Sequence, residues 1–207
     1  QDQIEYNLSK LKKFCLKNKL PFASFVVIQA GTKVMEMKNI GSFEKYFPVK
    51  NEIPVEIQLP KMIEICNKYE ILMKEHNTDY LSKESLAWHP KLGIHSANVA
   101  PEFGVIETKS LINLFKDMKM EKEKEEFLEI SLNSKKWEKW MIKGSKASDF
   151  EKSIISGHYI FSDERVVELK EKLNYVLKKK KNIGLDSLLQ NEISIVITKY
   201  LKAFRLI

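Results

Sequence analysis

The stretch Ile71–Glu102, ILMKEHNTDYLSKESLAWHPKLGIHSANVAPE, decides the fold that we expect. It contains two short apolar runs, Ile71–Met73 and Leu92–Ile94. A polar cluster follows each run directly, Lys74–Tyr80 after the first and His95–Asn98 after the second. Neighbouring parallel strands show this pattern when their carboxyl ends share one active-site face. We therefore expect two adjacent parallel strands with polar carboxyl ends.

A third run has the same design. Phe22–Ile28 is mostly apolar, as is typical of a strand buried on both faces of a parallel sheet, and the polar segment Gln29–Lys33 follows it. Apolar residues at helical spacing predict a helix over Gln3–Lys19 and another over Val55–Tyr69. Helix and strand thus alternate, and we expect an α/β fold with about three parallel strands.

The remaining segments are expected to be loops and helices. Gly31–Pro54 is a long connection, which we interpret either as a binding loop or lid, or equally as a surface insertion without a function. Ser82–Trp88 is expected to be a short helix that Ser82 caps and that Pro90 stops. From Phe127 onward no strand-like run with a polar end occurs, so this region is expected to be wholly helical.

The composition is that of a globular protein, and it argues against a nucleic-acid partner. The 207 residues carry a formal charge of +7, but the lysines are spread along the chain and mixed with 28 acidic residues. Only Arg165 and Arg205 are arginines, the side chain preferred for bidentate phosphate and base contacts. The block Lys178–Lys181 follows a predicted helix, whose negative end it complements. We expect a solvated basic surface.

No apolar run approaches the roughly 18 residues of a membrane span, and the first residues lack the pattern of a signal peptide. We therefore expect no membrane segment and a cytoplasmic location. Cys15 and Cys66 each lie in a helix with an apolar pattern, so we expect reduced, buried thiols.

Four segments together resemble a known family. EHNTDY (75–80), LNSKKWEKWM (132–141), GHYIFS (157–162) and YLKAFRLI (200–207) are similar to the C-terminal part of the class II D-tagatose-1,6-bisphosphate aldolase accessory (Z-type) subunits. The resemblance extends from Phe25 onward. It implies a TIM-type barrel subunit, often described as non-catalytic, that supports a separate catalytic zinc aldolase in galactitol and N-acetylgalactosamine breakdown.

The resemblance sharpens the expected fold. A closed (β/α)8 barrel needs eight parallel strands and roughly 250 residues, whereas this chain offers about three strands. We therefore expect residues 1–118 to be the last strands and helices of a TIM-type barrel and residues 119–207 to be a helical C-terminal extension packed on it. The chain would then be a fragment of a longer polypeptide or a half-barrel completed by another chain, in a hetero- or homo-oligomer. An open sheet in a smaller α/β domain is the alternative.

The polar strand ends supply the candidate site. His76 and His95 are candidate ligands for a divalent metal, zinc or manganese, with Glu75 and Asp79 as candidate acid–base groups. In the alternative interpretation both histidines hydrogen-bond to the backbone. The candidate residues for binding a sugar phosphate follow all three strands: Gln29, Thr32, Lys33, Asn77, Ser96 and Asn98.

Two functions remain open. The first is an accessory barrel subunit that stabilises a catalytic class II aldolase. The second is a metal-dependent sugar-phosphate aldolase, epimerase or isomerase that works through His76 and His95. The segment Leu92–Glu107 is richer in polar residues than the resemblance implies, and this keeps the second function open.

Overall fold

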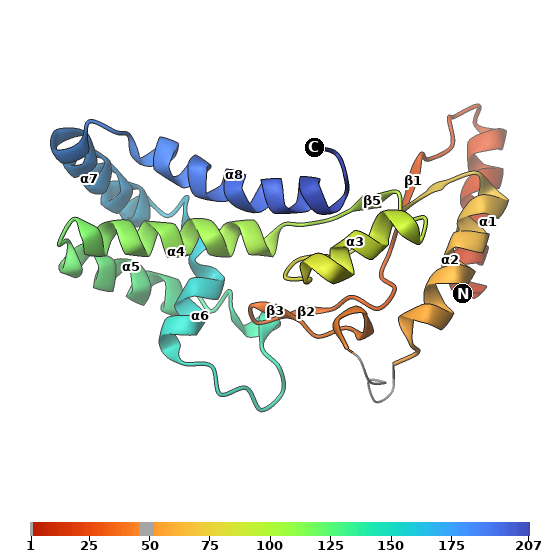
Figure 1. Ribbon diagram of the computed structural model, residues 1–207, viewed down its shortest axis with the longest axis horizontal. Coiled ribbons are helices and arrows are strands. Elements are labelled where there is room, and N and C mark those ends of the chain that lie inside the picture. The colour runs from red at the N-terminus through yellow and green to blue at the C-terminus, as the bar shows by residue number, and fades with distance from the viewer. Residues whose placement is uncertain (1, 46–51) are drawn as a thin grey trace. The chain divides into compact units, whose positions relative to one another are not determined.

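The computed structural model describes residues 2–45 and 52–207. The chain forms two compact units (Figure 1), the first of Gln1–Val34 and Asn39–Val99 and the second of Met35–Lys38 and Ala100–Ile207. The main division of the chain falls between residues 99 and 100, whereas the sequence predicts a boundary after residue 118. The intervening helix joins the second unit because Val105 and Phe115 belong to the helical core there.

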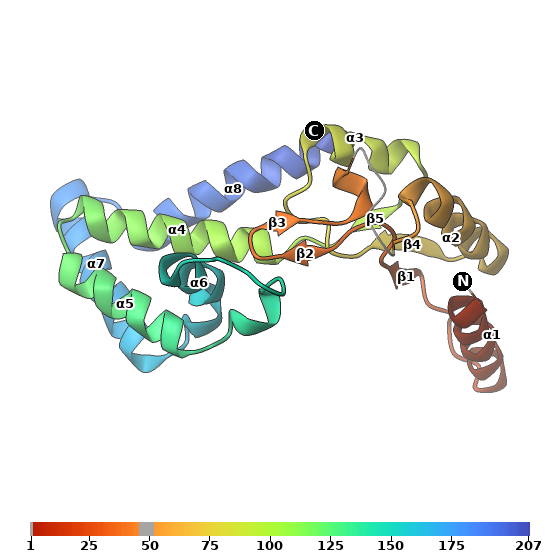
Figure 2. The ribbon, with the colours of Figure 1, turned by 90° about the horizontal axis from the view of Figure 1, so that it is seen from below.

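The first unit alternates helices and strands. Its elements are α1 (Asp2–Lys17), β1 (Phe25–Ile28), η1 (Ser42–Glu44), α2 (Val55–Tyr69), β4 (Leu72–Glu75), α3 (Lys83–Lys91) and β5 (Ser96–Ala97). The strands form one parallel sheet in the order β1-β4-β5 (Figure 2). The α/β class with three parallel strands is therefore confirmed. The described residues do not show a closed barrel.

A short second sheet lies where the chain passes between the units. It pairs β2 (Val34–Met35) with β3 (Lys38–Asn39). These strands and η1 occupy the described part of Gly31–Pro54, for which we expected a lid, a binding loop or an insertion; residues 46–51 of that segment lie outside the described residues.

The strand predicted at Leu92–Ile94 is wrong. Helix α3 continues past Pro90 to Lys91, and β5 begins only at Ser96. Proline removes one helical hydrogen bond, but here it lies in the last turn. The amide of Leu92 still donates to the carbonyl of Trp88 at 2.9 Å, and that of Ile94 donates to His89 at 3.1 Å. These bonds complete the helix end, so the predicted stop at Pro90 is also wrong.

The core of the first unit lies between the sheet and α2. Ile28, Met73 and Ile94 are buried in one cluster with Leu59 and Ile65 of α2. Since side chains alternate across a strand, the neighbours of Ile28 in β1 and of Met73 in β4 point to the opposite face of the sheet. Phe25, Val27 and Leu72 are accordingly exposed, at 43%, 54% and 41%.

Apart from Met35–Lys38, the second unit is helical, as predicted for the region from Phe127 onward. It contains α4 (Pro101–Asp117), α5 (Glu121–Asn133), η2 (Glu138–Trp140), α6 (Asp149–Ser156), η3 (Gly157–Ile160), α7 (Glu164–Lys181) and α8 (Leu185–Ala203). Fully buried side chains of α4, α5 and α7 form its core: Phe115, Phe127, Leu169, Leu173 and Leu177.

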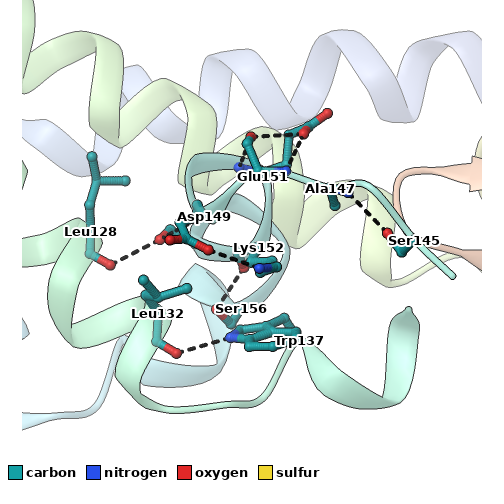
Figure 3. A network of polar contacts seen from close by, with 11 residues as sticks. Leu128, Leu132, Trp137, Ser145, Ala147, Asp149, Glu151, Lys152 and Ser156 are labelled. Atoms are coloured by element: carbon teal, nitrogen blue, oxygen red, sulfur yellow. Dashed lines mark hydrogen bonds and ion pairs between the residues drawn. The ribbon is translucent and has the colours of Figure 1, made fainter. Parts of the chain in front are cut away.

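Hydroxyl groups fix α6 against α5 (Figure 3). Ser148 and Glu151 form a reciprocal capping box at the start of α6, which satisfies amides that a helix start leaves unpaired. Ser153 donates to the carbonyl of Leu128 at 3.0 Å, and Ser156 donates to that of Ser131 at 2.9 Å. Beyond the end of α5, Trp137 Nε1 donates to the carbonyl of Leu132 at 2.9 Å (Figure 3).

Two further predictions concern the whole chain. None of the helices in the described ranges is long and apolar enough to cross a membrane. Cys15 and Cys66 are buried free thiols, as expected.

Candidate functional site at the carboxyl edge of the sheet

The strand register sorts the candidate residues onto two faces of the sheet. Val27 pairs with Lys74, and Lys74 with Ser96, so these three residues share one face. Ile28, Glu75 and Ala97 share the opposite face, which is the one that α2 covers. We call the face of Phe25, Val27, Leu72, Lys74 and Ser96 the open face, because its apolar members are exposed.

The alternation continues one residue beyond each strand. The amide of His76 donates to Ile28 O at 2.8 Å, and the amide of Asn98 donates to Glu75 O at 2.9 Å, as in a continued ladder. His76 and Asn98 therefore fall on the open face, and their side chains meet: Asn98 Nδ2 lies 3.4 Å from His76 Nδ1. Gln29 follows β1 in the same phase and is exposed. Three strand ends thus contribute polar side chains to one edge.

Glu75 belongs to the opposite face and is fully buried. Its Oε1 accepts hydrogen bonds from the Ala30 amide and the Thr32 hydroxyl, both at 2.8 Å. Its Oε2 makes no hydrogen bond to any residue in the described ranges. The carboxyl group therefore holds the loop after β1 against the end of β4.

Burial raises the pKa of Glu75 from its ordinary value of 4.5 to about 7, against the lowering effect of the Ala30 and Thr32 hydrogen bonds. The Thr32 hydroxyl also lies 2.6 Å from the His76 carbonyl oxygen. This hydroxyl has one proton, so it cannot donate to Glu75 and to His76 at once. A protonated Glu75 resolves the conflict, because it can donate to the hydroxyl while the hydroxyl donates to His76.

His95 is turned toward the backbone. Its Nδ1 accepts a hydrogen bond from the Met73 amide at 3.3 Å, and its own amide donates to Met73 O at 3.1 Å. The side chains of His76 and His95 thus have different partners. Within residues 2–45 and 52–207, no three His, Cys, Asp or Glu side chains come together as a potential metal site.

Asn39 is a site residue that the sequence reasoning missed. Its Nδ2 donates to the carbonyls of Asn77 at 2.9 Å and Asp79 at 3.0 Å, and its Oδ1 accepts from the amides of Lys33 and Gly41. Asn39 thereby ties the loop after β1 to the loop after β4. An asparagine in a loop gives no signal of such distant partners.

Of the remaining candidate residues, some form hydrogen bonds within the loops and others are exposed. Gln29 Nε2 donates to Thr32 O, and the side chain of Lys33 is exposed. Asn77 adopts a left-handed backbone with φ of 56°, while Asp79 is buried. Gln29, His76 and Asn98 therefore share the edge of the open face, while Thr32 and Glu75 contact each other on the opposite face. Lys74, which the sequence reasoning did not select, lies on the open face.

Comparison with known proteins shows the fold alone. The sequence matches no known family model and no curated protein. Its structure is similar to the crystal structure of a probable tagatose 6 phosphate kinase from Sinorhizobium meliloti 1021, with a TM-score of 0.62 and 14% sequence identity. The match covers 86% of this chain but 52% of that protein, so this chain spans about half of its length. The chain therefore shares an α/β architecture with that protein.

Proposed function

We propose that this chain is part of a (β/α)-barrel protein of sugar-phosphate metabolism and that it acts as an accessory subunit of a class II ketose-bisphosphate aldolase. One observation carries the proposal: Gln29, His76 and Asn98 follow three parallel strands and share one edge of the open face. Ligands of parallel α/β folds bind at this edge. The family resemblance and the sugar phosphate in the name of the similar protein support the substrate class.

The chemistry of the edge suits a phosphorylated sugar. The amides of Gln29 and Asn98 offer both donors and acceptors for hydroxyl groups. Lys74 lies on the same face, one strand residue before Glu75. Its ammonium group lies 5.5 Å from the centre of the exposed Phe25 ring and forms no ion pair with a described residue. A lysine is a point charge suited to phosphate. We assign Lys74 to the phosphate and His76 with Asn98 to the sugar.

Glu75 has a positioning role in this proposal. Its carboxyl group points away from the open face and binds the Ala30 amide and the Thr32 hydroxyl, so it shapes the loop that presents Gln29. Its raised pKa also makes it able to exchange a proton near neutral pH.

Calorimetric titration with D-tagatose 6-phosphate tests the binding site. Lys74→Ala should weaken binding by roughly tenfold or more, because a hydrogen bond to a charged group contributes about 1.5–3 kcal/mol. Lys61→Ala, an exposed lysine on α2, is the matched control and should bind like the wild type. Equal affinity of Lys74→Ala, His76→Ala and the wild type would contradict the site.

The accessory role needs a separate test. A catalytic class II tagatose-bisphosphate aldolase subunit is incubated at its inactivation temperature with and without this chain, and its remaining activity is followed. We expect a longer half-life with the chain, since binding to the folded state stabilises it by mass action. An unchanged half-life at saturating chain concentration would contradict the accessory role, whatever the titration shows.

The second candidate function is metal-dependent catalysis on the same sugar phosphates. The observation that favours it is the exposed His76 imidazole at the strand edge. The described residues do not supply three protein ligands beside it, so we derive no step through a metal. Elemental analysis of dialysed protein for zinc and manganese distinguishes the cases. Stoichiometric metal that is lost in His76→Ala but kept in His89→Ala would favour this function, and metal retained in both His76→Ala and His95→Ala would exclude it.

A further inference from the structure

A groove of about 930 Å³ lies on the first unit between α2, η1 and α3. None of the candidate site residues lines it. The groove is open, because Trp88 and Leu92 on its α3 side are 53% and 39% exposed. The groove thus combines exposed apolar side chains with a concave surface, a combination that helix-binding sites use.

Helix α2 contributes two neighbouring rows of side chains to the groove. Val55, Leu59 and Ile63 recur every four residues and form the apolar floor. The next row, one position further along the helix, contains Glu56 and Glu64, with a proline between them. Residues four apart lie above one another on a helix, so the acidic row runs parallel to the apolar row.

Helix α3 forms the opposite wall of the groove and, like α2, contributes both apolar and acidic side chains. Trp88 and Leu92 are its apolar contacts, and Ser85 lies one turn before Trp88. Glu84 in the first turn supplies a third exposed carboxylate. Phe43 of η1 also lines the groove.

The groove is acidic although the chain is basic. Its lining residues include four glutamates and one lysine, against a formal charge of +7 for the whole chain. Glu44 is engaged locally, because it accepts a hydrogen bond from the Ser82 amide at 2.5 Å. Glu56, Glu64 and Glu84 form no ion pair with a residue of the described ranges. Three carboxylates on the rim are thus available to a cationic partner.

We propose that this groove is the docking surface for an amphipathic helix of another protein, with an apolar stripe and lysine or arginine residues about two turns apart. The spacing follows from α2: Glu56 and Glu64 are eight residues, or about 12 Å, apart along the helix axis. Cations at positions i and i+7 or i+8 of the docked helix would face them, while its apolar stripe would lie on Ile63, Trp88 and Leu92. Helix-in-groove recognition uses this division between an apolar stripe and charged flanks.

A pair of labelled synthetic peptides tests the proposal. One is a leucine-striped helix with lysines two turns apart, and the other has glutamates at the same positions. Binding to the full chain is measured by fluorescence anisotropy at low salt. We expect the lysine peptide to bind at least about tenfold more tightly than the glutamate peptide, as several ion pairs act together and like charges repel.

Variants of the rim decide whether this preference arises in the groove. Glu56→Lys/Glu64→Lys should weaken the lysine peptide by about tenfold and strengthen the glutamate peptide. Glu168→Lys on α7 also replaces an exposed glutamate of a helix with lysine, and it should leave the affinity for both peptides unchanged. Trp88→Ala should weaken both peptides, since it removes part of the apolar wall.

Two results would overturn the proposal. Equal binding of the two peptides, unaffected by the rim variants, would mean that the groove is only an apolar surface. Self-association of the wild-type chain that the double variant abolishes, measured by sedimentation without peptide, would mean that a second copy of this chain is the occupant. Circular dichroism of each variant confirms that it is folded, so a loss of binding is assigned to the rim.

Discussion

Replacing Glu75 with glutamine should abolish a pH dependence of stability in the first unit. Glu75 is fully buried, and burial raises its pKa to about 7 from the ordinary 4.5. The folded protein therefore holds this proton more tightly than the unfolded chain does. Folding takes up a proton between pH 4.5 and 7, so stability falls as the pH rises through this window and levels off above it.

The magnitude follows from the two pKa values. A rise from 4.5 to about 7 corresponds to roughly 3 kcal/mol, at about 1.4 kcal/mol for each tenfold change in proton affinity. Glutamine keeps an oxygen that can accept from the Ala30 amide, and it is never charged. Relative to the wild type, Glu75→Gln should therefore gain up to about 3 kcal/mol of unfolding free energy between pH 5 and pH 8.

Urea titrations of both proteins at four pH values between 5 and 8 measure this difference. Trp137 and Trp140 are replaced by phenylalanine in both proteins, so that the fluorescence of Trp88 reports on the first unit. Subtracting the two curves removes the contribution of other groups. His158 is one of these, because burial lowers its pKa to about 4, and its contribution to stability rises with pH instead. Glu64→Gln, on an exposed carboxylate of α2, is the control and should run parallel to the wild type. Parallel curves for the wild type and Glu75→Gln would refute the reasoning.

Three further predictions concern other buried groups. A Cβ at Gly104 would lie 2.4 Å from the His158 ring, so Gly104→Ala should lower the free energy of unfolding in urea by about 1–3 kcal/mol. Adding His158→Ala should restore most of this loss. If it restores none, the strain lies elsewhere. Tyr200→Phe removes the hydroxyl that donates to the buried Glu102 carboxylate and should cost about 1–3 kcal/mol, and an unchanged urea midpoint would contradict that role. The Cys66 thiol is buried and its pKa is raised by burial, so a thiol reagent should modify it at neutral pH far more slowly in water than in urea, and equal rates would contradict the burial.

The alternation of helix and strand was predictable because each apolar run has a clear period and length. Val55–Tyr69 has the same bounds in the structure as in the prediction. The third strand was placed four residues too early, because Leu92–Ile94 is apolar for another reason: Ile94 is buried in the core beside the end of α3. A short apolar run records burial, and burial alone does not distinguish a strand from a helix end.

The position of a strand end also limits the prediction of the site, because a shift of one residue along a strand moves a side chain to the opposite face. The prediction ended the second strand at Met73, whereas β4 continues to Glu75. A strand end located to within two residues cannot assign faces, since neighbouring side chains point in opposite directions. Glu75 and His76 were therefore grouped as one site. The register separates them: Glu75 supports the loop after β1, and His76 faces the open side with Asn98.

The open face of the sheet carries exposed apolar side chains next to the candidate sugar-phosphate site. Phe25, Val27 and Leu72 are apolar and exposed, and they lie below the edge that carries Gln29, His76 and Asn98. Strands of this composition are ordinarily covered on both faces in parallel sheets. A layer over Val27 and Leu72 would also exclude water from Lys74, which lies on the same face, and an ammonium group binds phosphate more strongly where water is excluded. In the barrel that we propose, the open face would be the barrel interior and the remaining strands would cover it, so a chain that includes those strands should bind sugar phosphate more tightly than this chain does. Titrating D-tagatose 6-phosphate against both chains tests this coupling, and equal affinity in both titrations would contradict it.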